Sequence, residues 1–101
     1  MEIKAKCTDR NLLLQFSGEM DHHAARETIR ELELAIDAAL PRKLVLDMEG
    51  VTFMDSSGIA VILRAKRSME ALGGNLVVIH IPRQAAKVLE AAGLGRYVKL
   101  I

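Results

Sequence analysis

Aromatic residues and cysteine are scarce in this chain of 101 residues. It has two phenylalanines, one tyrosine and no tryptophan, so it lacks the aromatic platforms on which single-stranded nucleic acid stacks. Its only cysteine, Cys7, has no partner for an internal disulfide, and no CxxC pattern offers a metal or redox site. The formal net charge is only +1, and no basic patch is visible for DNA. We therefore expect no direct binding to nucleic acid.

Long apolar runs are missing as well. No segment approaches the roughly 20 apolar residues of a membrane span, and residues 1–10 are too charged for a signal peptide. The single cysteine fits a reducing compartment. We expect a cytoplasmic protein without membrane association, a monomer or a weak dimer. The length fits one domain spanning residues 1–101.

Strand and helix patterns alternate along the chain. We expect strands over residues 2–7, 12–17, 43–48, 75–79 and 97–101, with a turn at residues 8–11. Helical spacing of apolar residues predicts helices over residues 22–40 and 57–72, and a third helix that begins at Pro82. The order β-β-α-β-α-β-α-β predicts an α/β fold with a mixed, mostly parallel sheet flanked by about three α-helices.

Each predicted helix has an apolar stripe that we expect to face the core. Asp21 is the expected N-cap of the first helix, and Pro41 ends it. The stripes comprise Ala25, Ile29, Leu32, Ile36 and Ala39 or Leu40 in the first helix, Ile59, Ile62, Leu63, Met69 and Leu72 in the second, and Ala85, Val88, Leu89 and Ala92 in the third.

No pattern in the chain indicates an enzyme. A serine hydrolase needs a nucleophile, a base and an orienting group, but Asp-Ser-Ser-Gly lacks the first glycine of the Gly-x-Ser-x-Gly elbow. The adjacent His22 and His23 point in different directions on a helix, so they do not form the i, i+4 pair that grips zinc. No glycine pattern matches a phosphate-binding loop. We expect no catalytic residue, no metal and no cofactor.

The segment Phe53–Gly58 reads Phe-Met-Asp-Ser-Ser-Gly and lies where a predicted strand gives way to a predicted helix. One interpretation is a simple helix N-terminus, at which aspartate and serine accept hydrogen bonds from unpaired amides. The other is a regulatory serine. A phosphate brings nearly two negative charges, which a helix N-terminus tolerates, whereas a partner surface that fits the neutral hydroxyl does not.

Two blocks of the sequence resemble a known family. Gly-Glu-Met-Asp-His-His at residues 18–23 and the block at residues 53–63 are similar to the STAS domain, and within it to bacterial anti-sigma factor antagonists of the sporulation (SpoIIAA-like) type. The segments 73–78 and 89–94 continue the match. The resemblance extends over essentially the whole chain and implies the STAS fold.

The resemblance also implies a function. Members of the family bind an anti-sigma factor that is an ATP-dependent serine kinase, and binding releases the sigma factor. The kinase phosphorylates the serine that follows the motif aspartate, here Ser56, and a separate serine phosphatase reverses the modification. ATP is used by the kinase, so no cofactor is implied for this chain. The partner-binding residues implied by position are Asp21, Asp55, Ser57, Gly58 and Ala60, with Ser57 also supporting the helix.

Other interpretations stay open at the level of sequence. The chain could be a STAS module of a general stress-response switch, or of a lipid or anion transporter. A small serine hydrolase is a further alternative. Position 60 is alanine, where relatives often have glycine, and this departure leaves open which anti-sigma factor the chain recognises.

Overall fold

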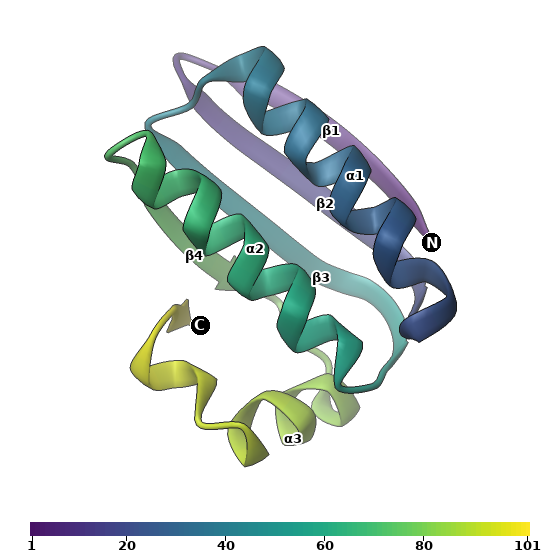
Figure 1. The fold of residues 1–101 in the computed structure, drawn as a ribbon. Helices are drawn as coiled ribbons and strands as arrows, with labels where there is room; N and C mark the ends of the chain where they lie inside the picture. Colours follow the sequence, from purple (N-terminus) through teal and green to yellow (C-terminus); the bar gives the residue numbers. More distant parts are fainter.

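Five strands form one sheet in the order β1-β2-β3-β4-β5, with β1 antiparallel to β2 and all other neighbours parallel (Figure 1). The structure, a computed structural model, describes residues 1–101. The strands are β1 (Glu2–Thr8), β2 (Asn11–Met20), β3 (Lys43–Met54), β4 (Asn75–Ile79) and β5 (Lys99–Leu100). The helices are α1 (His22–Ala39), α2 (Ser57–Ala71) and α3 (Arg83–Ala91), followed by the short 3-10 helix η1 (Leu94–Arg96). The predicted fold class is confirmed.

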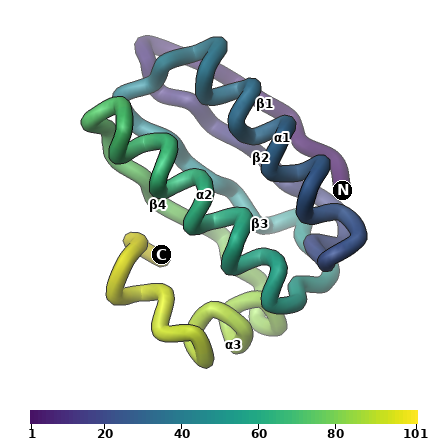
Figure 2. Tube along the Cα trace, in the orientation of Figure 1, coloured from purple at the N-terminus to yellow at the C-terminus, as the bar shows by residue number.

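The helices α1 and α2 lie side by side over one face of the sheet, and α3 lies near the start of α2 (Figures 1 and 2). Alternate residues of each strand point to opposite faces, so the helix-covered face takes every second side chain. On β2 these are Leu12, Leu14 and Phe16, and on β3 they are Leu44, Leu46 and Met48, all of them buried. They form one core cluster with Leu32 and Ile36 of α1 and Val61 and Ile62 of α2. No helix of the structure is both long enough and apolar enough to cross a membrane.

The first two strands form the predicted hairpin. Thr8 pairs with Asn11, and the two loop residues between them, Asp9 and Arg10, both have positive φ, at 50° and 63°. Two central residues with positive φ match the twist of the flanking strands, which makes this turn type common in two-residue hairpins. The turn predicted at residues 8–11 is therefore confirmed.

The strands β2 and β3 are both longer than predicted. We expected them to end at Ser17 and Met48, but they continue to Met20 and Met54. The pairing shifts register twice on the way, as happens at β-bulges. A Cβ atom on Gly50 would lie 2.7 Å from the Phe16 carbonyl oxygen and 2.8 Å from Ser17 Cβ. Only a residue without a side chain fits here, so Gly50 allows the irregular strand pairing to continue. In sequence, however, Glu49-Gly50 resembles a loop.

The apolar stripe of α2 also differs from the prediction. Ile62 and Met69 are buried as expected, but Leu63 and Leu72 are 41% and 42% exposed. The face that meets the core comprises Gly58, Val61, Ile62, Ala65 and Met69. Since residues 59–63 are all apolar, periodicity alone does not choose between overlapping faces. The two small residues of the buried face allow a close approach to the sheet.

The third helix and the last strand are both shorter than predicted. Ala92 is exposed, because α3 ends at Ala91 and Ala92 is the C-cap. The strand predicted over residues 97–101 shrinks to Lys99–Leu100, because the amides of Tyr97 and Val98 donate back to the Leu94 carbonyl at the end of η1. By contrast, the inward-facing Ala85 and Leu89 are buried as predicted.

Asp47 is a nearly buried carboxylate on the sheet face opposite the helices, with 8% of its surface exposed. Its Oδ1 accepts a hydrogen bond from the Glu49 amide (3.0 Å) and lies 3.1 Å from His80 Nδ1. Burial by itself raises the pKa of Asp47, but these contacts outweigh it and lower the pKa below its ordinary value. The ionised form of Asp47 therefore stabilises the fold.

We predict that Asp47→Asn lowers the free energy of unfolding at pH 7 by about 1–3 kcal/mol, because hydrogen bonds to a charged group are lost. The folded-state pKa lies below the unfolded value, so this stabilisation is present above about pH 4 and is lost as the pH falls through the folded-state pKa. Urea unfolding at pH 7 and at pH 3 should show a smaller difference between variant and wild type at pH 3. Glu31→Gln, which changes an exposed acid of α1, is the matched control. A difference that does not depend on pH would contradict the assignment.

Candidate functional site

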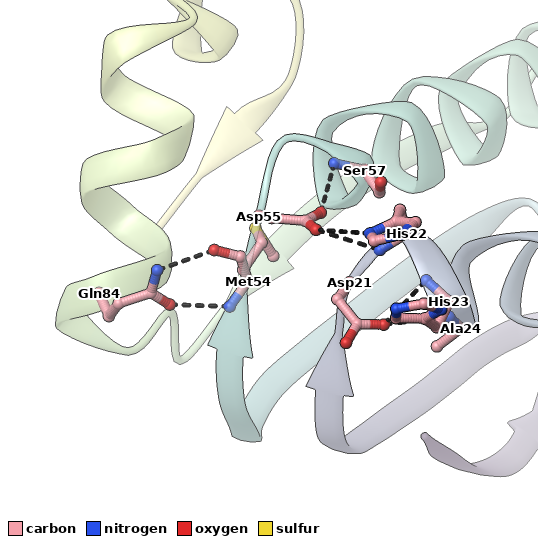
Figure 3. A network of polar contacts seen from close by, with 8 residues as sticks. All are labelled: Asp21, His22, His23, Ala24, Met54, Asp55, Ser57 and Gln84. Carbon is pink, nitrogen blue, oxygen red and sulfur yellow. Dashed lines mark hydrogen bonds and ion pairs between the residues drawn. The ribbon is translucent and has the colours of Figure 1, made fainter.

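Asp21 and Asp55 are brought together by the register of two parallel strands. Met20 and Met54, the last residues of β2 and β3, pair with each other, and an aspartate follows each of them. The Asp55 amide donates to the Met20 carbonyl (3.3 Å). Each strand then leads into a helix, α1 after Asp21 and α2 after Asp55. Two carboxylates and two helix N-termini therefore meet at one edge of the sheet (Figure 3).

Asp21 is the N-cap of α1, as predicted. Its backbone is extended, and its Oδ1 accepts hydrogen bonds from the amides of His23 and Ala24, both at 3.1 Å. An aspartate at this position satisfies amides that have no partner inside the helix, and its negative charge is favourable next to the positive end of the helix dipole. The cap fixes the Asp21 carboxylate at the first turn of α1.

Asp55 connects the starts of both helices. Its Oδ1 accepts from the Ser57 amide of α2 (2.8 Å), while its Oδ2 accepts from the His22 amide of α1 (3.1 Å) and lies 3.7 Å from His22 Nδ1. The hydrogen bond from Ser57 is the main cause that lowers the pKa of Asp55; partial burial opposes it, and the bond from His22 adds to it. Asp55 is therefore ionised at neutral pH.

Ser56 lies between this carboxylate and α2 and is exposed. It occupies the N-cap position, with φ −62° and ψ −16°, but its side chain makes no capping hydrogen bond. The hydrogen bond that holds the first turn is donated by the Ser57 amide to the Asp55 carboxylate. This corrects the expectation that a serine hydroxyl caps the helix: Ser57 contributes its backbone amide, and the Ser56 hydroxyl is left free for other chemistry.

Gly58 is buried beneath the first turn of α2. A Cβ atom there would lie 2.4 Å from Met54 Cγ and 2.6 Å from its sulfur, so any larger residue would force the Met54 side chain or α2 to move. The partner-binding role implied for Gly58 by its position stays a prediction, although the residue itself is buried. Its contribution is to set the height of α2 above the end of β3.

The outer side of α2 carries the exposed residues that continue from Ser56. Ala60, one turn further along, is exposed, and so is Leu63, which the sequence had assigned to the core. Residues three or four positions apart lie on the same side of a helix. Ala60 and Leu63 therefore form a small apolar surface next to the polar group of Asp21, Asp55 and Ser56.

Two residues of the site escaped the sequence patterns. His22 donates its backbone amide to Asp55, a role that any residue type except proline fills. Gln84 of α3 makes two hydrogen bonds to the backbone of Met54, although 30 positions separate the two residues. No local pattern reports such a contact, and a polar residue in the first turn of a helix attracts no notice by itself.

The contacts of the site do not assemble a hydrolase. His80 Nδ1 lies within hydrogen-bond distance of Asp47, His22 Nδ1 lies 3.7 Å from Asp55 Oδ2, and neither serine hydroxyl is bonded to a histidine. A nucleophilic serine needs such a base within hydrogen-bond reach. The arrangement instead presents a free hydroxyl between an anchored carboxylate and a helix N-terminus, which is suited to modification or to binding.

Comparison with known proteins identifies the family. The STAS domain profile matches residues 2–101. The chain belongs to the STAS domain family. This STAS domain is 30% identical over 91 residues to the anti-sigma F factor antagonist of Lysinibacillus sphaericus, covering 90% of this chain and 78% of the relative. It is 31% identical over 89 residues to that of Paenibacillus polymyxa, covering 88% and 76%.

Solved structures lead to the same conclusion. The anti-sigma factor antagonist SpoIIAA in its unphosphorylated form superposes with a TM-score of 0.82 at 26% identity, covering 99% of this chain and 88% of SpoIIAA. The phosphorylated form of SpoIIAA from Bacillus gives a TM-score of 0.73 at the same 26% identity, covering 99% and 91%. The STAS fold and the resemblance to SpoIIAA-like anti-sigma factor antagonists are thus confirmed. The proteins of this type are regulators rather than enzymes.

We predict that Gly58→Ala lowers the free energy of unfolding by about 1–3 kcal/mol, because the added methyl group forces Met54 or α2 to move. Gly95→Ala is the matched control, since a Cβ at Gly95 would meet only Leu100 Cδ1 at 3.9 Å. Urea unfolding monitored by circular dichroism measures both variants. Equal stability of the two variants would show that α2 does not depend on this close approach.

Proposed function

We propose that this STAS domain binds an anti-sigma factor that is also a serine kinase, and that phosphorylation of Ser56 ends the binding. Binding would release the sigma factor, and a serine phosphatase would restore the unmodified form. The similarity to anti-sigma F factor antagonists supports the choice of partner. The observation that carries the proposal is the exposed Ser56, whose side chain makes no capping hydrogen bond at the start of α2.

The position of Ser56 suits a kinase substrate. Its side chain is exposed and makes no capping hydrogen bond, so a kinase can bind the hydroxyl without breaking a contact of the fold. A phosphate at the N-terminus of a helix is stabilised by the helix dipole. Because the Ser57 amide is held by Asp55 rather than by Ser56, modification leaves the first turn of α2 intact.

The same position makes the phosphate effective against a partner. Asp55 is already ionised, because its pKa is lowered by its amide contacts, and Asp21 lies at the neighbouring helix start. Phosphorylation adds about −1.5 to −2 charges at pH 7 to this group. A partner surface that fits two carboxylates and a neutral hydroxyl would meet an excess of negative charge and added bulk. Like charges brought together across an interface cost several kcal/mol.

The proposed partner face has a polar and an apolar part. Asp21, Asp55 and Ser56 form the polar part, and Ala60 and Leu63 of α2 form the apolar part. Charged groups at such a rim contribute mainly to specificity and association rate, whereas apolar contacts that lose water contribute to affinity. The similarity to anti-sigma F factor antagonists favours this role over the stress-response and transporter alternatives that the sequence alone left open.

We predict that the cognate anti-sigma kinase, incubated with ATP, places one phosphate on Ser56, because this hydroxyl is the one left free at the site. Peptide mapping by mass spectrometry gives the position. Ser56→Ala should accept no phosphate, while the neighbouring Ser57→Ala should still be modified and is the matched control. Phosphate found on Ser57 or elsewhere, with Ser56 unmodified, would refute the assignment.

We further predict that Ser56→Asp folds normally but binds the anti-sigma factor at least about tenfold more weakly, since like charge at an interface costs more than the 1.4 kcal/mol of a tenfold change. Ser56→Ala should bind like wild type. Isothermal titration calorimetry at low and at physiological salt measures both, and the difference should shrink as salt screens the charges. Wild-type affinity of Ser56→Asp at both salt concentrations would rule out electrostatic exclusion.

A further inference from the structure

Gln84 forms a two-point clamp on the residue that precedes the Asp55-Ser56 loop. The Met54 amide donates to Gln84 Oε1 (2.8 Å), and Gln84 Nε2 donates to the Met54 carbonyl (2.8 Å) (Figure 3). A side-chain amide carries one donor side and one acceptor side, so it can replace the edge of a neighbouring strand. Gln84 belongs to the first turn of α3, so the clamp connects this helix to the end of β3.

The clamp acts where β3 has no neighbouring strand. On the β4 side, pairing ends at Asp47 and Ile79, and β3 continues for seven residues to Met54. Met54 is buried, so its amide and carbonyl on that side would lack partners without Gln84. A buried polar group left unpaired destabilises the fold. The clamp therefore stabilises the end of β3, which would otherwise fray on the side where β4 is missing.

Met54 is fixed from three directions at once. Its strand is tied to β2 by the hydrogen bond from the next amide to the Met20 carbonyl, its side chain is covered by Gly58, and its backbone is clamped by Gln84. Only Asp55 separates Met54 from Ser56. Displacement of Met54 would therefore shift the Ser56 hydroxyl relative to the Asp21 and Asp55 carboxylates.

We propose that Gln84 is a positioning residue for the phosphorylation of Ser56, holding the end of β3 so that the hydroxyl meets the kinase in a reactive geometry. This inference rests on the proposed function of Ser56. Proper orientation of reacting groups contributes to the rate of the chemical step more than to binding. Loss of the clamp should therefore lower kcat of the kinase for this substrate, while KM changes little.

The experiment compares Gln84→Ala with wild type in two measurements. Amide hydrogen exchange followed by NMR should be about tenfold faster at Met54, because the Met54 amide loses its acceptor on Gln84. Steady-state phosphorylation by the cognate kinase should show kcat lowered about tenfold and KM within about twofold, as expected for misplacement of a reacting group. Gln84→Glu keeps the acceptor for the Met54 amide and loses the donor to its carbonyl. Its exchange rate at Met54 and its kcat should therefore lie between those of wild type and Gln84→Ala. This variant replaces Gln84→Ala in the test if Gln84→Ala does not fold.

Lys87→Ala is the matched control, because Lys87 is exposed on the same helix and contributes no hydrogen bond to β3. It should behave like wild type in both measurements. Wild-type exchange at Met54, or wild-type kcat, in Gln84→Ala would overturn the role of Gln84 while Ser56 remains the modified residue. Absence of phosphate on Ser56 in the wild-type chain would instead overturn the proposed function, and the positioning role with it.

Discussion

One carboxylate holds the functional edge of this protein together. Asp55 accepts one hydrogen bond from a backbone amide of each of two helices, Ser57 of α2 and His22 of α1. Helix N-termini carry unpaired amides and partial positive charge, so they attract a shared anion. The contact fixes the two helix starts relative to each other and keeps Asp55 ionised. This contact also fixes the position of Ser56, the next residue along the chain.

The Asp55 contact depends in turn on the length of two strands. It forms only because β2 and β3 end together at the Met20–Met54 pair. Two shifts of register are needed to reach that pair, and Gly50 allows the close contact with Phe16 and Ser17 that the pairing requires. A bulged strand is usually a feature with a purpose. Here the irregular register delivers an aspartate at the end of each strand to the same edge of the sheet.

Local patterns in the sequence were sufficient for the fold class and for the Asp21 cap. The hairpin at residues 8–11, the Asp21 cap and the sheet class depend on neighbouring residues, and all were predicted correctly. Long-range contacts were not predictable in this way. The pairing beyond Gly50 and the buried face of α2 depend on how distant segments pack, and the Gln84 clamp joins residues 30 positions apart. Periodicity placed Leu63 in the core because residues 59–63 are all apolar, whereas the packing of α2 in the structure buries Val61 and Ile62 and leaves Leu63 exposed.

On the proposed function, the different roles of the adjacent residues Asp55 and Ser56 would allow phosphorylation to act without refolding. If the Ser56 hydroxyl capped α2, phosphorylation would exchange one cap for another and alter the helix start. Capping is instead assigned to Asp55, through the backbone of Ser57. The Asp55 carboxylate is held by hydrogen bonds from two backbone amides, and the neutral hydroxyl beside it is free. A second anion at Ser56 is compatible with the helix dipole, so the fold tolerates the change. The energetic penalty then falls on any surface that must approach this edge, where the two negative charges add.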